Sequence, residues 1–484
     1  MIEKGNSTFG VICKGLIICT FYPSDDSTQR AQSFFTQRLC GLCVLFPFAD
    51  FAWNKTLAKV QFKEVSSKNN LSQKVEKGKK FFRIIFQLSL VITLLFATAD
   101  AADRDAGVLL LDAPQGGNDG NILFSQNKDK PFIPASIVKI LTSLAAIHYL
   151  GEQYHFITPY SFDPKSKNLY IKGYGDPLLT SEVMEKICLE ILESYRTKEK
   201  VTKIHDIILD QSYYAASSAG HIHIPGKGNS LNPYDAPLGA LSLNYNTVNF
   251  QWDNYAKRFI SGEKQTPLLN VFLDDIKKTG LKKGRIVISS DLAKVYPGLL
   301  LKYFLEKQSM KITGKVREGR FIKDEKISRT FQSPYDLNAV IHKLLRYSNN
   351  FIANQILLTM GARTFGPPAT LEKGIKTMQN FIEQELKLSN ITIEEGSGLS
   401  RRNRISPAQM ILILKHFMPY HDLLRKKNND LFKTGTLTGV KTRAGYLLGK
   451  NDKLYPYVIM VNKPKANYDN ILNHLKGIVV RAGK

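Results

Sequence analysis

The 484-residue sequence is poor in acidic residues and in cysteine, and it has no apolar run of membrane-spanning length. The 42 Asp and Glu residues face 67 Lys and Arg residues, and the resulting net charge of +25 favours polyanionic surroundings such as nucleic acid, anionic lipid or an acidic cell-wall polymer. Four of the five cysteines lie within the first 43 residues, so a chain that begins later keeps only Cys188 and forms no internal disulfide. The main apolar stretch, 84–96, covers 13 residues, fewer than the roughly 20 that a spanning helix needs.

Apolar residues are abundant enough for a folded core. Hydrophobic residues make up 43% of the chain and aromatic residues 10%, which excludes a disordered protein. The length allows two or three domains.

Residues 77–101 have the order of a secretory signal. A basic segment, KGKKFFR (77–83), precedes the apolar stretch 84–96, and the small residues ATADAA follow it. We therefore expect a signal peptide over 75–101, cleavage at about Ala99 to Ala101, and an exported protein located in the periplasm or another extracytoplasmic space. An uncleaved membrane anchor is the alternative.

Residues 1–74 precede this signal, although a signal peptide normally begins a protein. The segment contains the spacing CGLC at 40–43, but a redox or metal interpretation needs a βαβ context or a second ligand pair, and neither is visible. We interpret 1–74 as a doubtful leader that arises from a mis-called start.

Helical and strand patterns alternate along the rest of the chain. Strands are predicted at 106–113 and 121–127, and a helix from about Pro134 to Gly151. The other predicted elements are helices at 291–307, 334–361 and 370–388, a three-strand meander formed by LFKTGTL, AGYLLGKND and LYPYVIMVN, and a C-terminal helix. Short strands and turns fill 161–290, which predicts an inserted, β-rich accessory region in an α/β domain formed by 102–160 and 291–484.

A serine and a lysine share one face of the predicted helix at 134–151. Ser136 and Lys139 are three positions apart, and Lys139 is the one ionisable group among apolar neighbours. Desolvation lowers the pKa of a lysine, and a neutral amine beside a hydroxyl can act as a general base. The alternative, a lysine that extends to solvent, is common, and Ser261 and Lys264 repeat the spacing in a hydrophilic loop.

Two weaker motifs follow in the sequence. Ser348-Asn349-Asn350 lies between two apolar helical stretches, where a short polar turn could project into a cleft; the alternative is a helix N-cap. Lys433-Thr434-Gly435-Thr436 lies on a predicted strand, where glycine permits close approach of a ligand and the lysine can hold a carboxylate. An edge strand with a solubilising lysine is the alternative, and Lys278-Thr279-Gly280 is a second copy of the triplet without the strand context.

The order S-x-x-K on a buried helix, S-x-N in a turn and K-T-G-T on a strand is the motif set of penicillin-recognising serine enzymes. Over about 103–484 the sequence resembles the low-molecular-mass class C penicillin-binding proteins, the D-alanyl-D-alanine carboxypeptidases and endopeptidases. Supporting segments are YGDP (174–177), DIILD (206–210), GALSLNYN (239–246), GSGLSRRN (396–403) and KTGTLTGVKTRAGYL (433–447). The interval from Ser136 to Ser348 also leaves room for the insertion that this group carries. The resemblance implies a β-lactamase/DD-peptidase-like antiparallel sheet flanked by helices.

The resemblance also implies roles for individual residues. Ser136 attacks the carbonyl between two D-alanines, Lys139 takes its proton, Ser348 protonates the leaving amine, and Asn350 orients the substrate amide and Lys139. The substrate-binding residues are Lys433, Thr434, Gly435 and Thr436; the backbone N–H groups of Ser136 and Thr436 form the oxyanion hole, and no metal or organic cofactor is required.

The implied partners are peptidoglycan stem peptides and β-lactam inhibitors, and peripheral association with the membrane or wall is compatible with the charge. The oligomeric state stays open. Nucleic-acid binding is disfavoured by the signal peptide and by the absence of a basic-aromatic module. The alternatives within the enzyme class are a β-lactamase or esterase, and outside it a non-catalytic wall-binding relative. His221 and His223 lack nearby carboxylates and are interpreted as loop residues rather than metal ligands.

Overall fold

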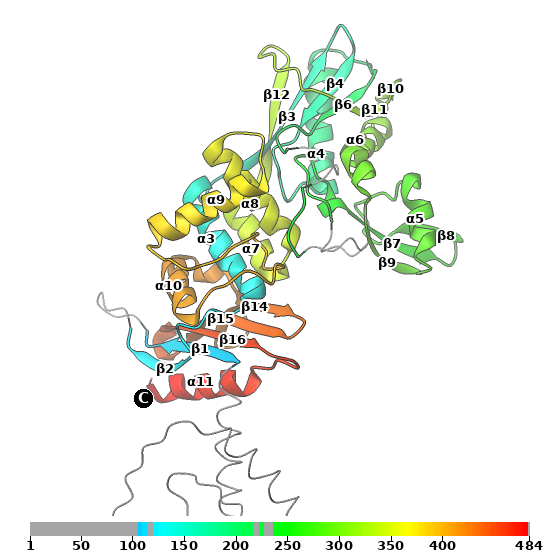
Figure 1. Ribbon diagram of the computed structural model, residues 1–484. Helices are drawn as coiled ribbons and strands as arrows, with labels where there is room; N and C mark the ends of the chain where they lie inside the picture. Colours follow the sequence, from blue (N-terminus) through cyan, green and yellow to red (C-terminus); the bar gives the residue numbers. More distant parts are fainter. Residues whose placement is uncertain (1–104, 114–119, 216–221, 227–235, 483–484) are drawn as a thin grey trace, which may run out of the picture. The chain divides into compact units, whose positions relative to one another are not determined.

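The computed structural model describes residues 105–113, 120–215, 222–226 and 236–482, all of which belong to the unit Leu88–Lys484 (Figure 1). The predicted leader (1–74) and signal peptide (75–101) lie outside the described residues, so both stay predictions.

A six-stranded antiparallel sheet joins the two ends of the described chain, in the order β13-β14-β15-β16-β1-β2. Its strands are β1 (Ala106–Leu111), β2 (Ile122–Gln126), β13 (Arg425–Lys426), β14 (Asp430–Leu437), β15 (Val440–Leu448) and β16 (Leu454–Asn462). The predicted strand pair and the predicted meander are therefore both confirmed, and β1 completes the sheet by pairing with β16.

Helices cover both faces of this sheet. The helical elements are η1 (Ala135–Ile137), α3 (Val138–Leu150), α7 (Leu337–Tyr347), α8 (Asn350–Phe365), α9 (Leu371–Asn380), η6 (Phe381–Glu385), α10 (Pro407–Phe417), η7 (Met418–Leu423), η8 (Lys450–Asp452) and α11 (Asp469–Ala482). Leu109 and Leu111 of β1 join the core formed with α3, α7, α8 and α10, whereas Val108 and Leu110 join the core formed with α11. This alternation follows from the two-residue period of a strand, and it confirms the predicted sheet flanked by helices.

The chain segment from β3 to β12 forms a second hydrophobic core. A five-stranded sheet has the order β11-β6-β4-β3-β12, and smaller sheets have the orders β8-β7-β9 and β10-β5. The strands are β3 (His155–Asp163), β4 (Asn168–Lys172), β5 (Lys203–Ile204), β6 (Ile207–Asp210), β7 (Thr247–Asp253), β8 (Arg258–Ser261), β9 (Lys283–Val287), β10 (Lys311–Ile312), β11 (Val316–Glu318) and β12 (Ser328–Asp336). The helices are α4 (Ser181–Ile191), η2 (Leu192–Lys198), η4 (Asn244–Asn246), η5 (Asn270–Phe272), α5 (Leu273–Lys278) and α6 (Ser290–Lys307).

This second core includes residues on both sides of the inserted region expected at 161–290. Tyr160 of β3, Leu300 of α6 and Phe331 of β12 are buried in it together with residues of α4 and β6. The periodicity of α6 shows that it has an apolar face, but periodicity does not say which core that face joins. We propose that the inserted part begins near β3 and ends near β12.

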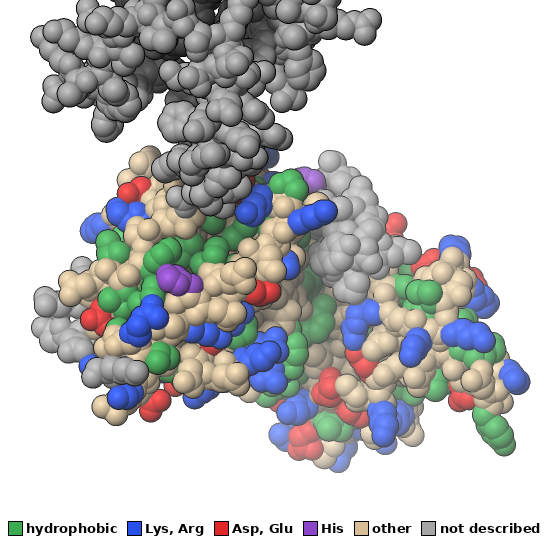
Figure 2. Space-filling view, turned by 90° about the horizontal axis from the view of Figure 1, so that it is seen from below, with side chains coloured by type: hydrophobic (Ala, Val, Ile, Leu, Met, Phe, Trp, Pro, Cys, Tyr) green, Lys and Arg blue, Asp and Glu red, His purple; other side chains and the backbone are tan. Residues whose placement is uncertain are grey.

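Charged side chains on the surface are more often basic than acidic. On the face shown in Figure 2, Lys and Arg side chains are more widespread than Asp and Glu, in line with the net charge of +25. None of the helices among the described residues is both long enough and apolar enough to cross a bilayer.

Candidate active site

Ser136 lies in the short helix η1, directly before α3. Its neighbour Ala135 is fully buried and adopts a left-handed backbone conformation, with φ of 48°. This conformation costs a residue other than glycine roughly 1 kcal/mol or more, and it persists only where the surrounding packing fixes it. The Ser136 side chain is half-buried, so its hydroxyl is placed at the edge of the core rather than within it.

Lys139 is completely buried, and its ammonium nitrogen contacts three acceptors. Nζ lies 2.9 Å from Ser136 Oγ, 2.7 Å from Asn350 Oδ1 and 2.5 Å from the carbonyl oxygen of Ser397. Burial lowers the pKa of Lys139 well below its usual value, the nearby Lys433 lowers it further, and the Glu395 carboxylate opposes both. Geometry and electrostatics therefore suit a neutral amine that accepts the Ser136 proton.

Ser348 and Asn350 come from the connection between α7 and α8. Ser348 ends α7 in a left-handed conformation, with φ of 54°, and Asn350 is the first residue of α8. The predicted inter-helical turn is present. The N-cap alternative applies to the residue between them, because Asn349 Oδ1 accepts a hydrogen bond from Ile352 N at 3.1 Å.

Lys433 extends from strand β14 to Ser348. Its Nζ donates to Ser348 Oγ at 2.7 Å and to the carbonyl of Thr434 at 2.6 Å. Burial lowers the pKa of Lys433 to about 7. The next motif residues lie further out, since Thr434 is half-buried and Thr436 is exposed.

Two glycines allow the backbone segments of the site to approach one another. A Cβ on Gly435 would lie 2.8 Å from Ser136 N and 2.3 Å from Thr442 Oγ1. A Cβ on Gly398, whose φ is +85°, would lie 2.1 Å from the carbonyl oxygen of Ala135. Strand β14 and the loop 396–398 therefore both pack closely against the Ala135–Ser136 peptide group.

Glu395 organises that loop, and the sequence motifs do not include it. The carboxylate is fully buried and accepts hydrogen bonds from six donors. The donors are Ser397 N (2.7 Å), Ser397 Oγ (2.5 Å), Gly398 N (2.6 Å), Ser400 N (3.2 Å), Asn403 Nδ2 (3.1 Å) and Asn354 Nδ2 (3.4 Å). The result is a fixed position for the Ser397 carbonyl that contacts Lys139. The only sequence signal is its place before the glycine- and serine-rich segment 396–400, where an acidic residue is usually exposed.

The duplicate motifs do not form a second site. Ser261 Oγ accepts from Glu263 N at 3.1 Å and Lys264 is exposed, so nothing there desolvates the amine. Lys278, Thr279 and Gly280 lie at the end of α5, where Lys278 pairs with Asp275 at 3.1 Å. Of the two histidines, His223 is exposed and His221 lies outside the described residues.

Comparison with known proteins shows what the chain is similar to. The profile of the D-Ala-D-Ala carboxypeptidase 3 (S13) family matches residues 98–270 and 276–431. D-alanyl-D-alanine carboxypeptidase DacB of Haemophilus influenzae is 20% identical over 454 residues, covering 77% of this chain and 91% of the relative. Penicillin-sensitive carboxypeptidase A of Dictyostelium discoideum is 23% identical, with 76% and 84% covered, and D-alanyl-D-alanine carboxypeptidase of Actinomadura sp. (strain R39) is 22% identical, with 72% and 76% covered.

Solved structures share the fold. Penicillin binding protein 4 (dacB) from Haemophilus influenzae superimposes with a TM-score of 0.61 at 18% identity, covering 78% of this chain and 96% of that chain. The same protein complexed with a novel β-lactam gives a TM-score of 0.56 over the same shares.

We predict that Glu395→Gln slows acylation of Ser136 by a fluorescent penicillin about 100-fold, because a displaced Ser397 carbonyl misplaces Lys139. The substitution also removes the negative charge that raises the pKa of Lys139. Because the neutral amine is the reactive form, the acidic limb of the pH–rate profile should move to lower pH. Stopped-flow acylation measured from pH 4 to 9 gives both quantities.

The control is Glu394→Gln, which changes a half-buried carboxylate in the same segment that pairs with Arg402 and accepts from Ser400 Oγ, and it should leave the limb in place. A slower Glu395→Gln variant with an unmoved limb would show that Glu395 only supports the fold.

We predict that Gly435→Ala lowers the acylation rate about 100-fold while the protein stays folded, because the added methyl group pushes β14 away from Ser136. Gly477→Ala in α11 is the matched control, since its nearest neighbour is the far end of Arg481 at 3.6 Å. Equal rates for both variants, in protein with native circular dichroism, would contradict the clamping role of Gly435.

Proposed function

The chain belongs to the D-Ala-D-Ala carboxypeptidase 3 (S13) family, and on that premise we propose how its residues hydrolyse the D-Ala-D-Ala bond of peptidoglycan stem peptides. It is a serine-type peptidase of the penicillin-binding class, a carboxypeptidase, an endopeptidase or both. The observation that carries the residue assignment is the fully buried Lys139 amine, 2.9 Å from the Ser136 hydroxyl.

Acylation begins at Ser136. Its oxygen attacks the carbonyl carbon between the two D-alanines, while the Lys139 amine takes the hydroxyl proton. Negative charge develops on the carbonyl oxygen, and the backbone N–H groups of Ser136 and Thr436 are the proposed donors to it. The Gly435 clamp supports this assignment, because it holds β14 against the Ser136 backbone.

Collapse of the intermediate expels the terminal D-alanine. Ser348 passes the proton that Lys139 took from Ser136 on to the leaving amine, and the hydrogen bond from Lys433 Nζ to Ser348 Oγ orients that hydroxyl. Asn350 holds the substrate amide and keeps Lys139 oriented through its 2.7 Å contact. Water then attacks the acyl-enzyme, returns a proton to Ser136 through Lys139 and releases the shortened peptide. A β-lactam acylates the same serine by opening its ring.

Carboxylate recognition falls to β14. Lys433 in its cationic form, with Thr434, Gly435 and Thr436, holds the terminal carboxylate of the substrate. The half-buried Thr434 and exposed Thr436 leave their hydroxyls accessible to a ligand.

A β-lactamase that activates water with a glutamate is the competing interpretation. Glu395 is the buried glutamate nearest in contact to the site, but its oxygens already accept six hydrogen bonds, so it is not available to deprotonate water. This favours the peptidase. For the location we propose export through the signal at 75–101, with peripheral association at the wall or membrane driven by the basic charge.

We predict that fluorescent penicillin labels the protein and that Ser136→Ala abolishes the labelling. Ser261→Ala, which removes the serine of the duplicate motif, should label like the wild type. Gel fluorescence after a timed reaction measures this. Absence of labelling in folded wild-type protein, or equal labelling of Ser136→Ala, would reject the assigned nucleophile.

We predict that kcat/KM for a D-Ala-D-Ala peptide falls at alkaline pH with an apparent pKa of about 7, the pKa of Lys433. Above that pH the free enzyme loses the cation that binds the carboxylate, since kcat/KM reports the ionisation of free enzyme. Lys433→Ala should raise KM about 10- to 100-fold, the value of a hydrogen bond to a charged group. Steady-state kinetics on the peptide and its C-terminal amide tests this, and an equal effect on both substrates would contradict the role.

A further inference from the structure

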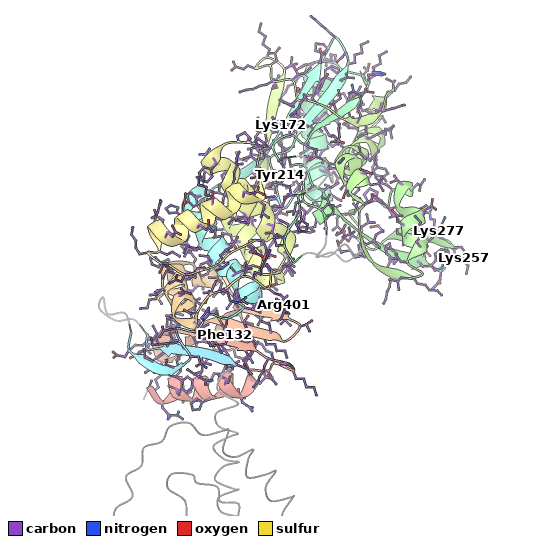
Figure 3. All side chains as sticks on the ribbon, viewed as in Figure 1. Phe132, Lys172, Tyr214, Lys257, Lys277 and Arg401 are labelled. Carbon is purple, nitrogen blue, oxygen red and sulfur yellow. The ribbon has the colours of Figure 1, made fainter. Side chains whose placement is uncertain are left out.

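A groove outside the candidate active site combines aromatic rings with exposed cations. It has a volume of about 970 Å³ and is formed by β7, β8 and α5, with Tyr303 of α6. We call it the basic groove and define it by Trp252, Lys257, Arg258, Phe259, Lys264 and Lys277. Figure 3 labels Lys257, in the turn before β8, and Lys277 of α5, which both line the groove.

Its charge is strongly one-sided. The four cations are all exposed, and of them Lys277 forms an ion pair with Asp274 at 3.3 Å. Glu263 is the one carboxylate among the residues that line the groove, and it is already paired with Arg285. A polyanion therefore finds a cationic surface with no competing free carboxylate in the lining.

The aromatic residues add apolar ring surface to this charge. Trp252 and Phe259 meet edge to face, with ring centroids 5.0 Å apart, and Tyr303 is 41% exposed. Rigid, partly exposed rings suit the flat apolar faces of sugars, so aromatic and cationic side chains together match a glycan that carries acidic groups.

A second hollow of about 430 Å³ adjoins the basic groove. Glu263 and Thr266 line both hollows. The second hollow is also lined by Tyr347 and Asn349, the two residues that flank Ser348.

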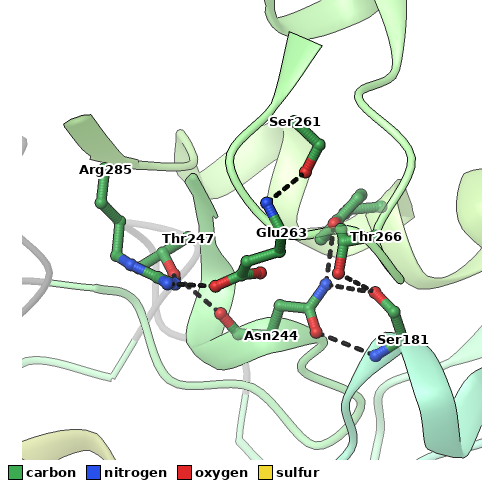
Figure 4. A network of polar contacts seen from close by, with 8 residues as sticks. Ser181, Asn244, Thr247, Ser261, Glu263, Thr266 and Arg285 are labelled. Carbon is green, nitrogen blue, oxygen red and sulfur yellow. Dashed lines mark hydrogen bonds and ion pairs between the residues drawn. The ribbon is translucent and has the colours of Figure 1, made fainter. Parts of the chain in front are cut away.

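A hydrogen-bond network fixes the wall that the two hollows share (Figure 4). Arg285 binds Glu263 and donates to Thr247 Oγ1 at 2.8 Å, and Thr266 Oγ1 donates to Ser181 Oγ at 2.8 Å. Asn244 Nδ2 also donates to Ser181 Oγ at 2.8 Å, which ties this wall to the first turn of α4. The shared wall is therefore a fixed part of the folded structure rather than a pair of loose loops.

We propose that the basic groove binds the glycan strand of an acidic, peptide-bearing wall polymer, while one of its peptides crosses the second hollow to Ser136. This inference rests on the proposed function and adds a polymer-binding site to it. It explains why a site for a short peptide is joined to an inserted part with a cationic groove.

The test compares polymeric and small substrates. The double variant Lys257→Glu/Lys264→Glu should release D-alanine from insoluble peptidoglycan about tenfold more slowly than the wild type. Its kcat/KM on a soluble D-Ala-D-Ala peptide and its fluorescent penicillin labelling should not change, because neither residue lies at the candidate active site. Lys311→Glu/Lys323→Glu, with the same net charge on exposed residues elsewhere, is the matched control and should behave as the wild type.

Equal losses in both double variants, or no loss in either, would overturn the proposal. Co-sedimentation with peptidoglycan tests groove binding even if the protein hydrolyses no peptide, so failure of the proposed function and failure of this inference give different results. Binding to phosphatidylglycerol vesicles that depends on Lys257 and Lys264, without binding to peptidoglycan, would also overturn the glycan assignment.

Trp252 provides a direct reporter of occupancy. The chain has two tryptophans, so in a Trp53→Phe background all tryptophan emission comes from the basic groove. Titration with soluble peptide-bearing glycan fragments should change the emission, and the change should weaken as salt increases. An unchanged emission spectrum at fragment concentrations that saturate co-sedimentation would contradict the proposal.

Discussion

The burial of the Lys139 amine is the constraint on which the arrangement of the other site residues depends. A charged ammonium with no solvent exposure is costly, so the group shifts towards its neutral form and needs acceptors at fixed positions. Ser136, Asn350 and the Ser397 carbonyl supply them from three separate segments. Each of these segments is in turn held by something else, which is why the site extends well beyond the residues of the three motifs.

The supports act mainly on the backbone. Gly435 lets β14 lie against Ser136 N, Gly398 lets the loop lie against Ala135, and Glu395 satisfies the N–H groups of that loop. Adding a methyl group at one of these glycines, or removing the Glu395 acceptor, therefore changes the geometry at Ser136 although Ser136 itself is unchanged. Lys433 is coupled to the same arrangement, since its charge lowers the pKa of Lys139 while its own Nζ binds Ser348.

The part between β3 and β12 gives the enzyme a second surface with different chemistry. Its own core contains α4 and α6 packed on the five-stranded sheet, so its loops can vary without disturbing the sheet that carries Lys433. The basic groove lies on this part, and the hollow that shares Glu263 and Thr266 with it is also lined by Tyr347 and Asn349, which flank Ser348. The inserted part therefore places some of the chain's excess positive charge on the same protein as a site for an acidic wall polymer.

The sequence alone determined part of the secondary structure and the membership of the motif set, but it predicted neither α4 within 161–290 nor α10. Local periodicity and turn residues predict β1, β2, the β14–β16 meander and α3, and the order of S-x-x-K, S-x-N and K-T-G-T distinguishes Ser136 from the duplicate at Ser261. Local patterns could not show that α6 and β12 pack with the inserted part, because the pattern of an apolar face does not indicate which core that face joins. They could not find Glu395 either, since its role depends on donors up to 41 positions away that meet only in the folded chain. Tertiary structure alone decided how deeply Lys139 is buried and which charges surround it, and desolvation is what makes a lysine into a base.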